Sequence, residues 1–311
     1  MGGRVLIALG GNAMTAPDGS ASPADQERAI GEAMAHVAAL SRAGHEVVLT
    51  HGNGPQVGNL LLKNQLAAHV VPPVPLDWCV AQTQGTIGTL IMNALQHELG
   101  HARVAAIVTR TLVDPADPAF QDPVKPIGRY FGEEEARRFE GHGQAWRRFD
   151  RGWRRVVASP RPVEILDASA AVALIDAGFT VVAAGGGGVP VVRQEDGTLT
   201  GIEAVIDKDL AAAVLAVAVG ATDLVIATDV PNAAVDFGTP RARPIGEIDV
   251  AALRELQAAG HFAGGSMGPK VEAALRFAEE TGGRAVITSL HHIGAALSGN
   301  IGTRVYRGVE R

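Results

Sequence analysis

Short runs of consecutive apolar residues alternate with longer segments of helical period, and this alternation constrains the fold more than any other feature. The first of these strand segments is residues 5–9, and the second is residues 46–50, in which 47–49 are apolar. They lack the apolar–polar alternation of a half-exposed strand, so each predicts a parallel strand buried on both faces. Further strands are expected at 104–109, 180–184, 224–228 and 285–289, with a final edge strand at 303–306.

Helix-length segments separate these strands. Ser22 followed by Pro23 is a favourable N-cap and first-turn pair for a helix that continues to about Arg42 and is ended by Gly44. Other helices are expected at 56–68, 81–99, 169–177, 210–219, 249–259 and 269–280. Strands and helices in this order predict an α/β fold, with a mostly parallel sheet covered by helices on both faces.

One segment interrupts the pattern. Residues 114–162 are rich in Pro, Gly, Arg and aromatic residues and have no long apolar period. Long irregular insertions in compact domains are commonly functional, so we expect 114–162 to form an inserted, lid-like subdomain.

Composition excludes several classes of protein. The chain has 311 residues, 47% of them hydrophobic and 19% charged, which allows a sizeable core. Its formal net charge of −6 provides no basic face for nucleic acid. No apolar run is long enough to span a membrane, no signal peptide is recognisable, and the single cysteine, Cys79, suits a reducing compartment. We therefore expect a cytoplasmic protein without membrane or nucleic-acid partners.

Glycine clusters follow three of the predicted strands, at 10–11, 52–54 and 185–188. The carboxyl ends of parallel strands share one edge of the sheet, where ligands bind. Glycines there can simply turn the chain, but they also let backbone N–H groups approach an oxyanion. Three clusters on one edge favour an anion site.

Familiar phosphate and metal motifs do not explain this site. The chain has no Gly-Lys pair for a Walker loop and no strict G-x-G-x-x-G. Asp236-Phe237-Gly238 matches the magnesium motif of protein kinases, but no His-Arg-Asp precedes it. His97-Glu98-Leu99-Gly100-His101 matches a zinc-hydrolase pattern, which requires a continuous helix, and Gly100 is expected to end the helix first.

Lysines are scarce, and their positions are informative. Only four of the 27 basic residues are lysines: Lys63, Lys125, Lys208 and Lys270. Lys208 and Lys270 stand at expected helix starts, where the helix dipole disfavours a cation unless an anion shares the site. Phosphoryl transfer needs charge neutralisation and alignment, which glycine amides and two or three lysines supply. Lys63 is expected to face solvent on its helix.

These residues belong to motifs that run in order through nearly the whole chain. They are Ala-Leu-Gly-Gly-Asn-Ala (8–13), His-Gly-Asn-Gly-Pro-Gln-Val-Gly-Asn (51–59), Asp-Pro-Ala-Asp (114–117), Lys-Pro-Ile-Gly (125–128), Arg-Gly-Trp-Arg (151–154), Gly-Gly-Gly-Gly-Val-Pro (185–190), Glu-Ala-Val-Ile-Asp-Lys-Asp (203–209), Gly-His-Phe (260–262) and Ser-Met-Gly-Pro-Lys (266–270). In these motifs the sequence resembles the carbamate kinases of the amino-acid-kinase superfamily.

The resemblance implies a three-layer, open αβα sandwich, usually a homodimer. Its activity would be reversible phosphoryl transfer between ATP and carbamate, giving ADP and carbamoyl phosphate, with Mg²⁺ held by the nucleotide phosphates and no direct metal ligand. It further implies one domain over 1–311, with an acceptor-binding half at about 1–184 and a nucleotide-binding half at about 185–311.

The resemblance also implies roles for residues of this chain. The expected phosphate-binding residues are Gly10, Gly11, Asn12, Gly185 and Gly186. The expected acceptor-binding residues are Gly52, Asn53 and Gly54. The expected nucleotide-binding residues are Asp207, Lys208, Thr228, Asp229, Met267 and Lys270. The expected catalytic residues are Lys125, Lys208, Asp209 and Lys270, with Asp209 organising the lysines.

Two departures sharpen these expectations. Acetylglutamate kinase and aspartokinase relatives place a lysine two residues before the paired glycines, whereas this chain has Ala8, so Lys125 is the candidate replacement cation. After Thr228-Asp229-Val230, residues 231–235 lack the aromatic residues usual in the family, which reduces the area available to stack a nucleotide base.

Two alternatives to a carbamate kinase stay open from the sequence. One is a sibling enzyme that phosphorylates another small carboxylate. The other is a catalytically idle nucleotide-binding regulator, which the altered base region favours and the retained lysines disfavour.

Overall fold

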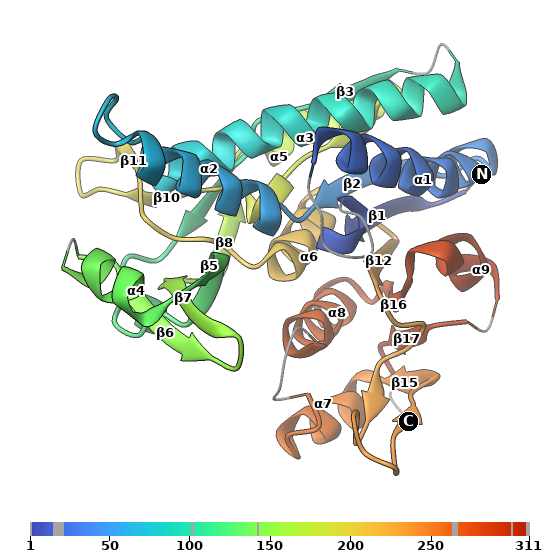
Figure 1. Ribbon diagram of the computed structural model, residues 1–311. Helices are drawn as coiled ribbons and strands as arrows, with labels where there is room; N and C mark the ends of the chain where they lie inside the picture. The colour runs from blue at the N-terminus through green and yellow to red at the C-terminus, as the bar shows by residue number, and fades with distance from the viewer. Residues whose placement is uncertain are drawn as a thin grey trace.

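The centre of the molecule is an eight-stranded sheet (Figure 1). The computed structural model describes residues 2–14, 22–100, 103–141, 143–262, 267–299 and 301–308, apart from the side chains of residues 12 and 13. The strand order is β15 (Glu247–Asp249), β17 (Thr303–Tyr306), β16 (Arg284–Ser289), β12 (Asp223–Thr228), β1 (Arg4–Leu9), β2 (Glu46–His51), β9 (Thr180–Val182) and β3 (Val104–Ala106). All neighbours from β16 to β3 are parallel, and only β16 and β17 pair antiparallel.

Helices cover both faces of this sheet. Along β1, Val5 and Ile7 pack with α1 (Pro23–Arg42), α3 (Leu76–Leu99) and α9 (Ile293–Ser298). Leu6 and Ala8 point the other way, into a core shared with α5 (Ala168–Asp176), α6 (Lys208–Ala218), α7 (Val250–Ala258) and α8 (Met267–Thr281). A strand with apolar side chains on both faces requires two covering layers. The expected αβα sandwich is confirmed.

Helix ends follow the local signals of the sequence. Ser22 caps α1 by accepting a hydrogen bond from the Asp25 N–H, and Pro23 occupies the first turn. Gly100 has a positive φ of 66° directly after α3, so the helix ends before His101, which lies outside the described residues. The two histidines of the zinc-like motif therefore do not share one continuous helix.

A second, four-stranded sheet extends the carboxyl-terminal edge of the first. Its order is β11 (Leu199–Gly201), β10 (Val189–Arg193), β4 (Arg110–Val113) and β8 (Pro162–Ile165). The expected strands 104–109 and 180–184 were too long: β3 ends at Ala106 and β9 at Val182. Beyond β3, the Thr109 main chain bonds to the Gln84 side chain on α3, and the Thr109 carbonyl also accepts from the Val189 N–H of β10, so the chain passes from the main sheet to the second sheet there.

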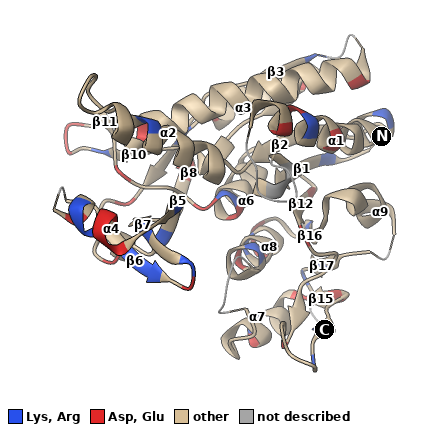
Figure 2. Cartoon of the chain, in the orientation of Figure 1, with Lys and Arg blue, Asp and Glu red and all other residues tan. Residues whose placement is uncertain are grey.

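The segment 114–162 contains a separate antiparallel sheet. Its strands are β5 (Lys125–Phe131), β7 (Gly152–Val157) and β6 (Ala145–Phe149), with α4 (Glu133–Glu140) between β5 and β6. Phe131, Phe139 and Trp146 form an aromatic cluster inside this subdomain. Figure 2 shows basic residues, in blue, on the β6–β7 hairpin and acidic residues, in red, on α4 beside it. This sequence-irregular region is thus a small folded unit with its own core.

The subdomain rests on α2 (Gly54–Ala67). Val57 and Leu61 of α2 share a core with Ile127 of β5 and Val157 of β7. The backbones are so close that a Cβ on Gly58 would lie 2.7 Å from the Cα of Gly128. Only glycine fits such an approach.

The expectation that β17 is an edge strand was wrong. β15 pairs with it on the outside, and a short hairpin of β13 (Ala234–Val235) and β14 (Arg243–Pro244) lies nearby in the chain. β15 has only three residues, Glu-Ile-Asp, which carry no strand signal of their own. None of the described helices has the length and apolar character needed to cross a bilayer.

Candidate active site

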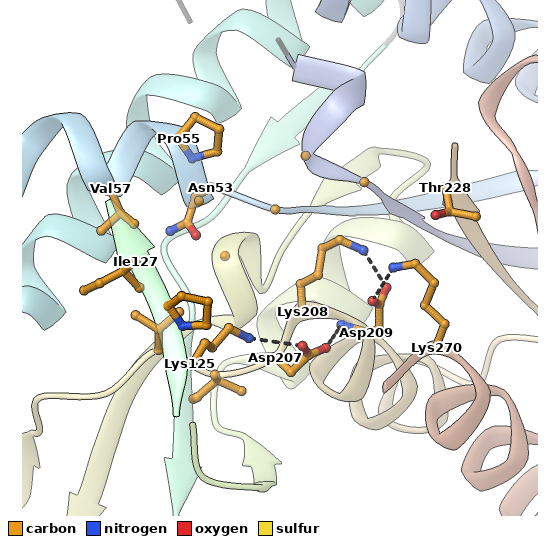
Figure 3. A pocket seen from close by; sticks show the side chains of 18 of the residues that line it. Asn53, Pro55, Val57, Lys125, Ile127, Asp207, Lys208, Asp209, Thr228 and Lys270 are labelled. Atoms are coloured by element: carbon orange, nitrogen blue, oxygen red, sulfur yellow. Dashed lines mark hydrogen bonds and ion pairs between the residues drawn. The ribbon is translucent and has the colours of Figure 1, made fainter. Parts of the chain in front are cut away.

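A cavity of about 380 Å³ opens at the carboxyl ends of β1, β2 and β12, between the sandwich and the subdomain (Figure 3). Glycine turns, three lysines and three aspartates surround it. Its lining residues are Gly10, Gly11, Gly52, Asn53, Gly54, Pro55, Val57, Lys125, Pro126, Ile127, Gly186, Val205, Ile206, Asp207, Lys208, Asp209, Thr228, Asp229 and Lys270. The structure thus gathers most of the residues singled out in the sequence.

Three expected site residues are not among these lining residues. The Asn12 side chain lies outside the described part of the chain. Gly185 is buried behind the cavity, where an added Cβ would lie 2.3 Å from His51 Nε2. Met267 packs against the core beneath α8. Ser266, in the motif before Lys270, also lies outside the described residues.

Lys208, Asp209 and Lys270 form one buried cluster. Asp209 accepts a hydrogen bond from Lys208 Nζ at 2.5 Å through Oδ1 and from Lys270 Nζ at 2.8 Å through Oδ2. Lys208 and Asp209 lie in the first turn of α6, and Lys270 lies in the first turn of α8. Two helix N-termini and two ammonium groups therefore converge around one carboxylate, leaving a local excess of positive charge for an anion to neutralise.

Burial changes the pKa of a lysine in this cluster. Burial lowers the pKa of Lys208; the negative charge of Asp209 opposes this shift, and the charge of Lys270 adds to it. An ammonium group that is poorly hydrated binds an incoming phosphate more strongly than one exposed to water. The Lys208 stem lies against Gly52, whose added Cβ would approach Lys208 Cδ to 3.3 Å.

Lys125 reaches the same cavity from the subdomain. Its Nζ donates to Asp207 Oδ2 at 3.0 Å, while Asp207 Oδ1 accepts from the Asp209 N–H at 2.9 Å as the N-cap of α6. Burial alone would raise the pKa of Asp207, but the charges of Lys125 and Lys208 and its hydrogen bonds outweigh that effect and lower the pKa to about 2. Asp207 is therefore ionised throughout the physiological range.

Glycines bring the main chain close to the cavity on the sandwich side. Gly10 follows β1, and an added Cβ there would lie 3.0 Å from the Ala227 carbonyl oxygen. The Gly52 N–H bonds to the Leu9 carbonyl at 3.1 Å, which ties the turns after β1 and β2 together. Gly11 has no atom within 4 Å of its missing Cβ, so the space above it is open to a ligand.

Asn53 and the 184–188 turn form the opposite wall. Asn53 Nδ2 donates to Thr83 Oγ1 at 2.9 Å, and an added Cβ on Gly186 would lie 2.2 Å from the same nitrogen. Ala184, Gly186, Gly187 and Gly188 all have positive φ, a conformation that favours glycine. The glycines of this cluster are therefore required because the turn is tight and packs closely against Asn53.

Buried polar groups that sequence reasoning did not identify support this turn. Thr50 Oγ1 donates to the Ala184 carbonyl at 2.9 Å, and Thr111 Oγ1 donates to the Gly187 carbonyl at 2.8 Å. The Ala184 N–H donates to Thr109 Oγ1 at 3.0 Å. Threonine is common in strands on packing grounds alone, so these positions carry no separate signal in the sequence.

His51 lies beneath the cavity and was also not singled out. Its Nδ1 donates to the Gly52 carbonyl, with the two atoms 2.8 Å apart. Burial, together with the charge of Lys208, lowers the pKa of His51 to about 4, although the Gly52 hydrogen bond opposes this. His51 is neutral at pH 7 and acts as a rigid support for the turn.

Metal ligation by protein side chains finds no support in the part of the chain that the structure describes. No group of three His, Cys, Asp or Glu residues there could hold an ion. Of the three aspartates that line the cavity, Asp207 and Asp209 are paired with lysines, and Asp229 directly follows β12.

The comparisons with known proteins agree with this geometry. The model of the Amino acid kinase family matches residues 3–289. The chain belongs to the amino acid kinase family. Carbamate kinase 1 of Enterococcus faecium and the carbamate kinase of Pyrococcus furiosus are each 45% identical to it, over 98% of this chain and 99% of theirs.

Solved structures place this amino acid kinase with the carbamate kinases. A carbamate kinase from Giardia lamblia bound to AMP-PNP superposes with a TM-score of 0.93 at 42% identity, covering 99% of both chains. An aspartate kinase from Synechocystis shares only the fold, with a TM-score of 0.54 at 17% identity. Ala8 is consistent with this placement: it is buried in the sheet core, and Lys125 supplies a cation from the subdomain.

Proposed function

We propose that this phosphotransferase is a carbamate kinase that interconverts ADP plus carbamoyl phosphate and ATP plus carbamate. The observation that carries the proposal is the convergence of Lys125, Lys208 and Lys270 with the Gly10–Gly11 turn on one cavity. Relatives that are 45% identical over 98% of this chain and 99% of their own are named carbamate kinases, which supports carbamate as the acceptor.

Each residue's role in the reaction would follow from its position in the cavity. Lys208 and Lys270, fixed by Asp209, bind the nucleotide phosphates, and the amides of Gly10 and Gly11 receive the transferring phosphoryl group. The N-terminus of α2, beginning at Gly54, together with Asn53, faces the carbamate end. Lys125 neutralises charge on the phosphoryl group from the subdomain side.

No protein base is required. Carbamate is an anion whose oxygen is already deprotonated, so transfer needs alignment and charge neutralisation rather than proton removal. This fits a site in which Asp207 and Asp209 are tied to lysines and in which His51 is neutral and donates to Gly52.

Mg²⁺ would enter with the nucleotide. Because lysines hold Asp207 and Asp209, at most Asp229 of the cavity carboxylates would face the ion, so the donor set suits an ion carried by phosphate oxygens, whose charge it would partly neutralise. Binding of ADP would then stay measurable without Mg²⁺ but strengthen with it.

The division of the chain into functional parts belongs to the same proposal. The half at about 1–184 would bind the acceptor, the half at about 185–311 would bind the nucleotide, and the subdomain at 114–162 would close over both as a lid. Ala233 and Val235 are buried in the core, so reduced stacking on the nucleotide base remains a prediction for the 231–237 region.

We further propose a homodimer located in the cytoplasm. Leu66, Val70, Val71 and Trp78 are large apolar side chains exposed at the end of α2 and the start of α3, which suits a surface covered by a second copy. Light scattering on the purified protein would test this by its molecular mass.

A coupled assay tests the activity. ATP formation from ADP and carbamoyl phosphate is expected, with acetyl phosphate as a poorer donor and with acetylglutamate and aspartate giving no ADP in the reverse direction. A sibling enzyme would prefer one of the latter acceptors. Tight nucleotide binding with no turnover on any substrate would instead indicate a regulator.

A further inference from the structure

Two ion pairs join the subdomain sheet to the segment that precedes α6. Besides Lys125–Asp207, Arg155 on β7 pairs with Glu203. In the sheet register Lys125 faces Val157 and Ile127 faces Arg155, so Lys125 and Arg155 project from the same face of the sheet. Their partners, Glu203 and Asp207, are four residues apart in one segment.

Backbone contacts connect the same two elements. Ala158 forms a parallel bridge with Ala204, and the Val205 N–H donates to the Ala158 carbonyl at 3.0 Å. The segment is therefore held along β7 by its main chain and by one ion pair on each side of the bridge. A shift of the Arg155 pair would be transmitted to β5 through the β5–β7 hydrogen bonds, and so to Lys125.

The Arg155 pair is unequally buried. The Arg155 side chain is only 14% exposed, whereas that of Glu203 is 60% exposed. Burial lowers the pKa of Arg155, and the charge of Glu203 opposes this. Both residues line a cavity of about 590 Å³ whose other walls include Leu61 and Leu76. A buried guanidinium that loses its carboxylate is strongly destabilised, so it would move towards water and displace β7.

We infer that Glu203 is a positioning residue: through Arg155 it sets the place of β5 and thereby aims Lys125 into the active-site cavity. This inference rests on the proposed function, because it gives Lys125 its part in phosphoryl transfer. Glu203 itself does not line that cavity. Its effect should therefore appear on turnover and not on the binding of ADP, which depends on Lys208 and Lys270.

Glu203→Gln tests the inference, with Glu195→Gln as the matched control. Glu195 is an exposed glutamate in the turn between β10 and β11, eight residues before Glu203. We expect Glu203→Gln to lower kcat on the order of 10-fold with KM for ADP changed less than about 2-fold, because small misplacements of a catalytic group are costly. Glu203→Asp should recover part of the loss. Glu195→Gln should match the wild type, and equal kcat values for both Gln variants would overturn the inference.

A double-mutant cycle separates positioning from a merely structural role. If Glu203 acts through Lys125, Glu203→Gln should lower kcat by less than about 2-fold in a Lys125→Ala background. The same loss in both backgrounds would show that Glu203 does not act through Lys125.

Hydrogen exchange provides a readout that does not depend on activity. Amides of 125–131 should exchange faster in Glu203→Gln than in the wild type or in Glu195→Gln. Unchanged exchange would refute the inference even in an inactive protein, while an inactive wild type would count against the proposed function alone.

Discussion

The cations of the active site are held in two different ways. Lys208 and Lys270 stand on helices of the sandwich, with side chains 13% and 7% exposed, and share Asp209, which is 4% exposed. Lys125 stands on a separate small sheet, is 25% exposed and has its own partner, Asp207. Lys208 and Lys270 are fixed because α6 and α8 pack into the large core on one face of the sheet. The position of Lys125 instead depends on how the subdomain packs against α2. In the proposed function, the first arrangement would retain the nucleotide, and the second would let Lys125 move with the subdomain as it closes.

The largest expected effect comes from removing a fixed cation. Lys270→Ala deletes one ammonium and leaves Asp209 with Lys208 alone. We expect kcat/KM to fall on the order of 10³-fold, with ADP affinity reduced in parallel, because a charge-assisted contact to the phosphates is lost in both ground and transition states. Steady-state kinetics and calorimetry with ADP measure the two quantities.

Lys63→Ala is the matched control for that change. Lys63 is exposed on α2, outside the cavity, and its replacement should leave both quantities within about 2-fold. Normal ADP affinity in Lys270→Ala would contradict a nucleotide-binding role for the buried cluster.

Lys125, on the subdomain, should behave differently. We expect Lys125→Ala to lower kcat on the order of 10²-fold while ADP affinity stays within about 2-fold, because Lys125 meets the transferring group and not the nucleotide. The same two measurements apply. If ADP affinity fell as far as in Lys270→Ala, the distinction between the two regions would fail.

The sandwich side of this comparison is much easier to predict from sequence than the subdomain side. Buried parallel strands have continuous apolar runs, and glycines at their carboxyl ends mark the ligand edge, so β1, β2 and the approximate site followed directly. The lysines at helix starts signalled an anion because a cation there is otherwise unfavourable. These signals are local.

The subdomain and the second sheet depend on contacts distant in sequence. β5 and β7 pair across more than twenty residues, with aromatic and arginine side chains that have no simple period. Beyond β3, Thr109 contacts Gln84 on α3 and Val189 of β10, both distant from it in the sequence. The pairing of Arg155 with Glu203 likewise requires both elements to be folded first. Local pattern cannot specify such partners.

Gly58→Ala would disturb the seating of the subdomain without touching any cation. Its Cβ would lie 2.7 Å from Gly128 Cα, so α2 and β5 must move apart. Overpacking of this kind typically costs about 1–3 kcal/mol, and we expect kcat to fall about 10-fold with ADP affinity unchanged. Urea unfolding and steady-state kinetics measure both.

Gly31→Ala is the control, and we expect it to change the free energy of unfolding in the opposite direction. Gly31 lies within α1 with no atom within 4 Å of its missing Cβ, so alanine should stabilise the protein by about 0.5–1 kcal/mol and leave kcat unchanged. Equal stability and kinetics in the two variants would mean that the contact with Gly128 does not hold the subdomain in place.

The last prediction concerns the pH dependence of stability. It depends on Asp207, which links the two regions. Its pKa is about 2 in the folded protein against a reference value of 3.8, so the unfolded chain binds more protons between these values. The carboxylate therefore contributes stability that is complete above about pH 4 and is lost as the pH falls through 2. The shift corresponds to about 2 kcal/mol at most.

Urea unfolding of the wild type and Asp207→Asn should show a stability difference at pH 6 that shrinks between pH 4 and 2.5. Asp150→Asn, an exposed change of the same chemistry on the subdomain, reports the effect of losing a surface charge. A wild-type advantage over Asp207→Asn that persisted undiminished at pH 2.5 would mean that Lys125 and Lys208 do not hold this carboxylate ionised, and that its ion pairs do not help to seat the subdomain.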